Sequence, residues 1–195
     1  MKQTRRAPQN AGMGRFTVPL LAFFLAVVFC AGTLIAFWQC QREDQRLRAW
    51  FLTQARMLAQ MIPLDQLQHL SGSPGDAQSP VYQTLKKQLM SVRSLNPQCR
   101  FIYLLGRHEG RVFFFMDSEP PESKDCSPPG QEYSEAVEPM RRVFHTGIES
   151  VVGPYSDRWG TWVSAVAPLK HPDTGELLAL FAMDMDARDW RSDVR

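Results

Sequence analysis

The segment "DRWGTWVSAVAPL", residues 157–169, contains a regular alternation of side chains and decides what kind of sheet this chain forms. Successive side chains of a strand point to opposite faces, so Trp162 and Ser164 share one face while Val163 and Ala165 share the other. The second face is small and apolar throughout, which predicts that it packs against helices. The first face then points away from those helices.

The strand pattern continues on both sides of that segment. Residues 100–119 hold two β-rich runs around a polar turn at Arg107–Gly110, which is a hairpin signature. Further strands are expected over Ile148–Val152, Thr161–Leu169 and Leu177–Met185. Since mostly short loops join the last three, the order of elements predicts an α+β domain with one five-stranded antiparallel sheet.

Helical patterns surround and interrupt these strands. Apolar residues recur every three or four positions over Gln41–Ile62, where Pro63 ends the pattern. A second helix is expected over Val81–Leu95. Ser134–Phe144 favours a short third helix, although Pro139 inside it is a flaw.

A long apolar run precedes all of these elements. Phe16 to Trp38 holds 23 positions without a charge, and about 20 apolar residues in a helix suffice to cross a bilayer. A secretory signal is the alternative, but the run is long for a signal core and no A-x-A cleavage site follows it before Gln39. The run therefore predicts an uncleaved transmembrane helix.

The basic residues around the run set its expected orientation. Lys2, Arg5, Arg6 and Arg15 precede it, whereas the three arginines that follow within ten residues come with acidic neighbours. The positive-inside rule then places the amino terminus in the cytoplasm and residues 41–195 outside it. We expect a single-pass protein of the inner (plasma) membrane with a periplasmic, extracytoplasmic domain.

Composition and motifs exclude several functional classes. The net charge is +2, and no basic stripe interleaved with aromatic residues indicates nucleic-acid binding. The four histidines share no short motif, and no serine lies in a G-x-S-x-G setting. No cysteine pair has metal-ligand spacing. We therefore predict no catalytic residue, metal site or cofactor in this chain.

Two of the four cysteines would lie in the oxidising compartment. Cys99 and Cys126 would flank the first hairpin, so a disulfide is geometrically possible there. Two free thiols are an equally acceptable interpretation.

Four stretches of this chain, "FIYLLGR", "DSEPPESKDCSPPG", "VVGPYSDRWGTWVSAVAPL" and "DMDA", resemble a known family. They are similar to the PAS-like, or Cache-type, extracytoplasmic sensor domain at the N-terminus of bacterial sensor histidine kinases. The resemblance covers nearly all of residues 40–190. It implies the input half of a two-component receptor, whose transmitter would lie beyond residue 195 or in a partner. The expected divisions are a cytoplasmic tail at 1–15, a transmembrane helix at 16–38, the juxtamembrane and second helices at 39–98, the sensor sheet at 99–190 and a C-terminal tail at 191–195.

The resemblance also implies a pocket on one face of the sheet, capped by residues 119–147 and 153–160. Such a pocket needs apolar walls with a few fixed polar groups. Aromatic residues that could form the walls are Tyr103, Phe115, Tyr133, Tyr155, Trp159 and Trp162. Arg158 could present a planar fork to a carboxylate, while Asp117 and Asp184 could hold an amine. The expected ligand is a small carboxylate or an amino acid.

Alternatives to this interpretation exist for the domain and for single residues. Asp157 and Arg158 could pair only with residues of the sheet, and both tryptophans could belong to the core. The pocket could be filled by side chains, and the domain could be an anchored interaction module without a small ligand. The apolar stripe on Gln41–Ile62 also suits a parallel homodimer, and a helix that runs out of the membrane could transmit movement across it.

Overall fold

The computed structural model describes residues 14–194. They divide into two units, one up to Glu43 and one from Asp44 onward. Helix α1, Gly14–Ala59, extends through both as one uninterrupted helix. Of the helices among residues 14–194, α1 alone is long and apolar enough to cross a membrane, judged by length and composition.

The second unit contains a five-stranded sheet in which every neighbouring pair is antiparallel, as the sequence predicts. The spatial order is β2-β1-β5-β4-β3, so β5 lies at the centre. The strands are β1 (Phe101–His108), β2 (Arg111–Asp117), β3 (Ser150–Asp157), β4 (Gly160–Lys170) and β5 (Leu177–Asp186).

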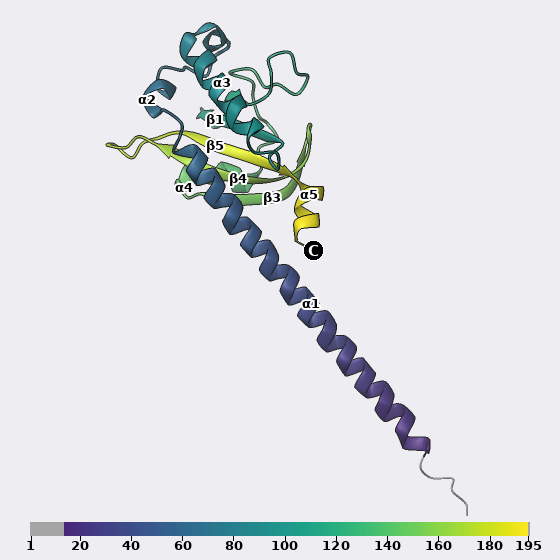
Figure 1. Ribbon diagram of the computed structural model, residues 1–195. Coiled ribbons are helices and arrows are strands. Elements are labelled where there is room, and N and C mark those ends of the chain that lie inside the picture. Colours follow the sequence, from purple (N-terminus) through teal and green to yellow (C-terminus); the bar gives the residue numbers. More distant parts are fainter. Residues whose placement is uncertain (1–13, 195) are drawn as a thin grey trace, which may run out of the picture. The chain divides into compact units, whose positions relative to one another are not determined.

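Helices cover both faces of this sheet (Figure 1). The last turns of α1 and helix α3, Pro80–Ser94, pack on one face, where Phe51 and Leu89 belong to the same hydrophobic core as Val163 of β4. Helix α4, Glu138–Thr146, packs on the other face with Trp162. The division of β4 into a small apolar face toward the long helices and a second face carrying Trp162 is therefore confirmed. The minor helical segments are α2 (Leu64–Leu67), the 3-10 helix η1 (Pro74–Gln78) and α5 (Ala187–Asp193).

The first hairpin closes through two residues rather than the four-residue turn that the sequence suggests. Strand β1 continues to His108, and Glu109 and Gly110 both have positive φ, 49° and 81°. Two such residues give the type I′ turn, whose twist matches that of the adjoining strands.

Two elements, β3 and α4, have boundaries several residues away from the prediction, and one helix, α5, was not predicted. Strand β3 does not stop before Gly153 but continues to Asp157, with an irregularity between Val152 and Tyr155. The left-handed φ of 113° at Gly153 makes that irregularity possible.

Helix α4 begins at Glu138 instead of Ser134, so Pro139 occupies its first turn, where no amide donor is needed. Helix α5 was not expected, because its only signal is the capping carboxylate of Asp186, which accepts a hydrogen bond from the Arg188 amide at 2.7 Å.

Candidate ligand-binding site

A small cavity lies on the α4 side of the sheet. Its volume, measured as space for the centre of a water molecule, is about 20 Å³, and one water needs about 10–15 Å³ by that measure. As it stands, the cavity therefore accommodates about one water molecule. The residues that line it are Phe101, Tyr103, Phe114, Asp117, Asp125, Ser127, Tyr133, Asp157, Trp159 and Asp184.

Asp184, on the central strand β5, is the buried carboxylate of this cavity, with 3% of its surface exposed. Tyr103 Oη donates to its Oδ1 at 3.0 Å, and Ser164 Oγ donates to the same oxygen at 2.5 Å. Within residues 14–194, neither a lysine nor an arginine pairs with it, and no group donates to its Oδ2. Burial raises the pKa of this carboxyl to about 7, although the two hydroxyl donors oppose the shift.

Tyrosines connect this carboxylate to the cover of the cavity. Tyr155 Oη and Ser164 Oγ lie 2.8 Å apart, and Tyr133 Oη donates to Asp157 Oδ2 at 2.8 Å. Burial raises the pKa of Tyr103, Tyr133 and Tyr155, so these phenols stay neutral hydrogen-bond donors. Tyr133 thereby joins the loop after β2 to the turn between β3 and β4.

Asp157 holds the turn that opens the "DRWGTW" segment. Its Oδ1 accepts hydrogen bonds from the amides of Trp159 and Gly160, at 2.9 and 3.2 Å, and from Trp162 Nε1 at 2.9 Å. The turn sets Trp159 against Phe114, with ring centroids 5.9 Å apart. Asp157 thus closes the hairpin, and the wall of the cavity includes Trp159.

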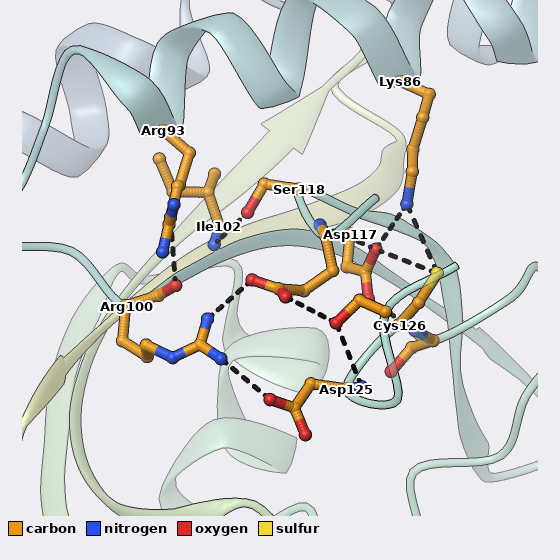
Figure 2. A network of polar contacts seen from close by, with 11 residues as sticks. Lys86, Arg93, Arg100, Ile102, Asp117, Ser118, Asp125 and Cys126 are labelled. Atoms are coloured by element: carbon orange, nitrogen blue, oxygen red, sulfur yellow. Dashed lines mark hydrogen bonds and ion pairs between the residues drawn. The ribbon is translucent and has the colours of Figure 1, made fainter. Parts of the chain in front are cut away.

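Asp117 also lines the cavity, but the protein already supplies its cation (Figure 2). Lys86 Nζ of α3 lies 2.5 Å from Asp117 Oδ1, and the side chains are only 6% and 4% exposed. Asp117 Oδ2 accepts a hydrogen bond from the Ser127 amide. Asp117 therefore fixes the loop after β2, in contrast to Asp184.

Cys126 lies beside this pair. Its Sγ is 3.6 Å from Lys86 Nζ and 3.7 Å from Asp117 Oδ1. Cys126 and Cys99 are both free thiols, so the structure has no disulfide between them. Burial raises the pKa of each, and that of Cys99 reaches about 12.

Phe115 does not belong to this site, because it packs on the α1 and α3 side of the sheet. The pairing of β1 with β2 shifts between Leu104 and Leu105, so Leu104 faces Met116 while Leu105 faces Phe114. The extra residue is a β-bulge, and it breaks the alternation that would put Phe115 and Asp117 on one face.

Arg158 and Trp162 lie outside the cavity, on an open groove of about 750 Å³. Arg158 makes a two-fold ion pair with Glu135, with both N–O distances 2.6 Å. Tyr155 does not line the cavity, but its Oη lies 2.8 Å from Ser164 Oγ, which in turn donates to Asp184. The structure thus brings together five of the nine predicted residues: Tyr103, Asp117, Tyr133, Trp159 and Asp184.

Sequence reasoning missed other lining residues. Phe101 precedes Tyr103 by two positions in β1, so strand alternation alone would have found it. Assigning Phe114 to the cavity requires knowledge of the β-bulge in β2. Asp125 and Ser127 lie in a proline-rich loop without periodicity and have no such signal.

Three solved structures of one receptor are similar to this chain in fold. They are the sensory domain of the Campylobacter jejuni chemoreceptor Tlp3 with isoleucine bound, its ligand-binding domain with L-valine, and the sensory domain in a third crystal structure. The TM-scores are 0.55, 0.53 and 0.52, at 13%, 14% and 11% sequence identity. The matches cover 94%, 94% and 88% of this chain, and 68%, 68% and 67% of the other chains.

The chain has the fold of a PAS-like sensor domain. No protein-family model and no curated protein matches it in sequence. The resemblance inferred from the four sequence stretches is confirmed at the level of fold.

Proposed function

We propose that the unit from Asp44 onward is the sensory input domain of a receptor and binds a small molecule with a protonated amine, such as an amino acid. The observation that supports this most is Asp184, which is buried at the cavity and has no cationic partner within residues 14–194. A buried carboxylate without a cation is costly, so a ligand ammonium there gains strongly from charge pairing.

The hydrogen bonds of Asp184 favour one position for that ammonium. Both hydroxyl donors, from Tyr103 and Ser164, approach Oδ1. Oδ2 is then the oxygen to which an ammonium donates. Phe101, Phe114 and Trp159 line the same cavity with aromatic surface, which suits an apolar ligand side chain.

The small volume of the cavity defines how binding must proceed. An amino acid is several times larger than one water molecule, so the loops that cover the cavity must move for a ligand to enter. We infer that the loops at 118–137 and 157–160 rearrange on binding, and that the bound and free states differ in their packing on the sheet. A ligand can shift such an equilibrium only through its different affinity for the two states.

Helix α1 is the proposed route of the signal. We infer that residues 16–38 span the inner membrane with the amino terminus in the cytoplasm, and that the sheet unit lies outside. Because α1 is one helix from Gly14 to Ala59, a displacement at Phe51 or Ala55 extends along a single element. The output is of the histidine-kinase type by sequence resemblance, and pairing of two copies through α1 completes the proposal. The apolar stripe expected to serve this pairing is covered by the domain's own core, where Phe51 and Ala55 are fully buried, so pairing would use the exposed Trp50 and Met57 instead.

Thermal unfolding of the full chain in detergent tests the ligand class. L-isoleucine and L-valine are the first compounds to use, since the Tlp3 structures hold them. A ligand at a hundredfold excess over its Kd stabilises the folded state by about 2.7 kcal/mol. We expect isoleucine and its decarboxylated amine to raise the Tm, and the hydroxy acid analogue without the amine to have no effect.

Two variants locate the effect. Asp184→Asn should abolish the ligand-induced shift, while Asp186→Asn should preserve it, because Asp186 pairs with Arg188 outside the cavity. An equal shift with the hydroxy acid, or an unchanged shift in Asp184→Asn, would show that the proposed amine site is wrong.

A further inference from the structure

A ten-residue loop that follows β2 covers one side of the cavity. We name residues Ser118–Ser127 the strap, because both ends are tied to the sheet. At its start, the Ile102 amide donates to Ser118 Oγ at 3.0 Å. At its end, the Ser127 amide donates to Asp117, which is paired with Lys86.

The middle of the strap is held by one arginine. Arg100 Nη1 donates to Glu119 Oε1 at 2.6 Å, and Arg100 Nη2 donates to Asp125 Oδ2 at 2.8 Å. Figure 2 shows the Arg100 guanidinium directed toward the Asp125 carboxylate. Ser123 links the Glu119 carboxylate to the backbone of Asp125, since its Oγ donates to Glu119 Oε2 and accepts from the Asp125 amide. One guanidinium thus holds the two carboxylates in the middle of the strap.

Arg100 also stands where the cavity meets the surface. Its Cζ lies 4.0 Å from the ring centroid of Phe101, a cavity wall, and its amide donates to the Asp184 carbonyl at 2.7 Å. Asp125 and Trp159 line both the cavity of about 20 Å³ and the open groove of about 750 Å³. The ion pair of Arg100 with Asp125 therefore lies at the boundary between the two spaces.

The two ionic anchors of the strap differ in exposure. Lys86 and Asp117 are 6% and 4% exposed, whereas Arg100 and Asp125 are 34% and 25% exposed. Water can replace the partners of a partly exposed ion pair at little cost, but not those of a buried pair. The Lys86 anchor and the contact of Arg100 with Glu119, whose side chain is only 8% exposed, are thus retained, whereas the contact of Arg100 with Asp125 is releasable.

We propose that Arg100 is a positioning residue that holds the strap over the cavity, and that ligand enters from the groove when Asp125 leaves Arg100. The ligand part of this inference rests on the function proposed above, while the closure of the strap by Arg100 does not. The site then has a defined entrance, and Arg100 controls the rate of access without contacting the ligand.

Cys126 measures strap opening without any ligand. It belongs to the strap, is partly buried, and its raised pKa keeps it a poorly reactive thiol in the closed state. Alkylation of the full chain in detergent by iodoacetamide, followed by mass spectrometry of the Cys126 peptide, gives the opening rate or population. Arg100→Ala should raise the labelling rate about tenfold, equivalent to about 1.4 kcal/mol, through the loss of two charge-assisted hydrogen bonds.

Three further variants separate opening from general loosening. Asp125→Asn releases only the groove-side contact and should also speed labelling, to a smaller extent. Arg100→Lys, which keeps the charge, should restore part of the protection. Arg56→Ala removes a surface ion pair with Glu149, far along the chain from the strap, and should leave Cys126 labelling unchanged. Urea unfolding of each variant shows whether global unfolding contributes.

The outcomes distinguish the two proposals. Unchanged Cys126 labelling in both Arg100→Ala and Asp125→Asn would overturn the role of Arg100. Faster labelling confirms it, even if isoleucine and valine bind to no variant, in which case the proposed ligand class fails alone. When a ligand binds, Arg100→Ala should raise its association and dissociation rates together, and a change in the dissociation rate alone would contradict entry beneath the strap.

Discussion

Asp184→Asn removes a buried carboxyl group whose pKa is near 7 in the folded protein and 3.8 in the ordinary state. Below pH 3.8 the group is protonated in both the folded and the unfolded chain, so it does not affect stability through charge. As the pH rises toward 7, the unfolded chain loses its proton while the folded chain retains it, which lowers stability. Above pH 7 both forms are ionised and the loss is complete.

The size of this loss follows from the pKa difference. The difference between a pKa of about 7 in the folded chain and 3.8 in the unfolded chain corresponds to about 4 kcal/mol. Asparagine stays neutral at every pH and keeps an oxygen that accepts from Tyr103 and Ser164. We therefore expect the stability of Asp184→Asn relative to the natural chain to increase by up to about 4 kcal/mol between pH 4 and pH 8.

Urea unfolding followed by tryptophan fluorescence, in detergent at constant ionic strength, measures this difference. Asp186→Asn is the matched control, because its partner Arg188 holds the pKa of Asp186 near 2. The stability that Asp186 contributes is present above its unfolded pKa and is lost only as the pH falls toward 2. The difference in stability between Asp186→Asn and the natural chain should therefore stay constant from pH 4 to pH 8. An equal difference for Asp184→Asn at both ends of that range would refute the reasoning.

Three more variants test the packing around the site. Lys86→Met should cost about 3–5 kcal/mol in urea unfolding, because it leaves the buried Asp117 carboxylate unpaired; a loss below about 1 kcal/mol, the range of surface pairs, would contradict this. Phe115→Ala should cost about 3–5 kcal/mol of stability while leaving the Kd of any cavity ligand unchanged, since Phe115 lies on the other face of the sheet; calorimetric titration checks the Kd. Gly153→Ala should lower the Tm and cost at least about 1–3 kcal/mol, because its Cβ would lie 2.5 Å from the Trp162 carbonyl oxygen at a φ of 113°; an unchanged Tm would show that the bulge in β3 is adaptable.

The fold could be predicted from the sequence because local patterns determine most of it. The alternation in residues 157–169 assigned Trp162 and Val163 to the correct faces of β4. This reasoning fails where a single residue interrupts the alternation of side chains along a strand. The bulge in β2 placed Phe115 on the face opposite to its prediction, and the irregularity at Gly153 let β3 continue beyond the expected end.

The candidate site was less predictable, because its decisive contacts join distant parts of the chain. Arg158 has the geometry that suits a ligand carboxylate, but Glu135, 23 residues earlier, already occupies it. Lys86 neutralises Asp117 from 31 residues away, and no spacing rule connects a helix to that strand end. Asp184 was selected as an amine partner, and the absence of a cation beside it within residues 14–194 became visible only in three dimensions.

Trp190 of α5 donates a 2.9 Å hydrogen bond from Nε1 to Asp44 Oδ1, and its ring lies 5.8 Å from that of Phe51. The first and last turns of the sheet-bearing unit are therefore neighbours. A domain whose two ends lie close together can be inserted into a loop of another protein without forcing the ends of that loop apart. We therefore expect residues 44–193 to fold when they are inserted between adjacent helices of an unrelated scaffold.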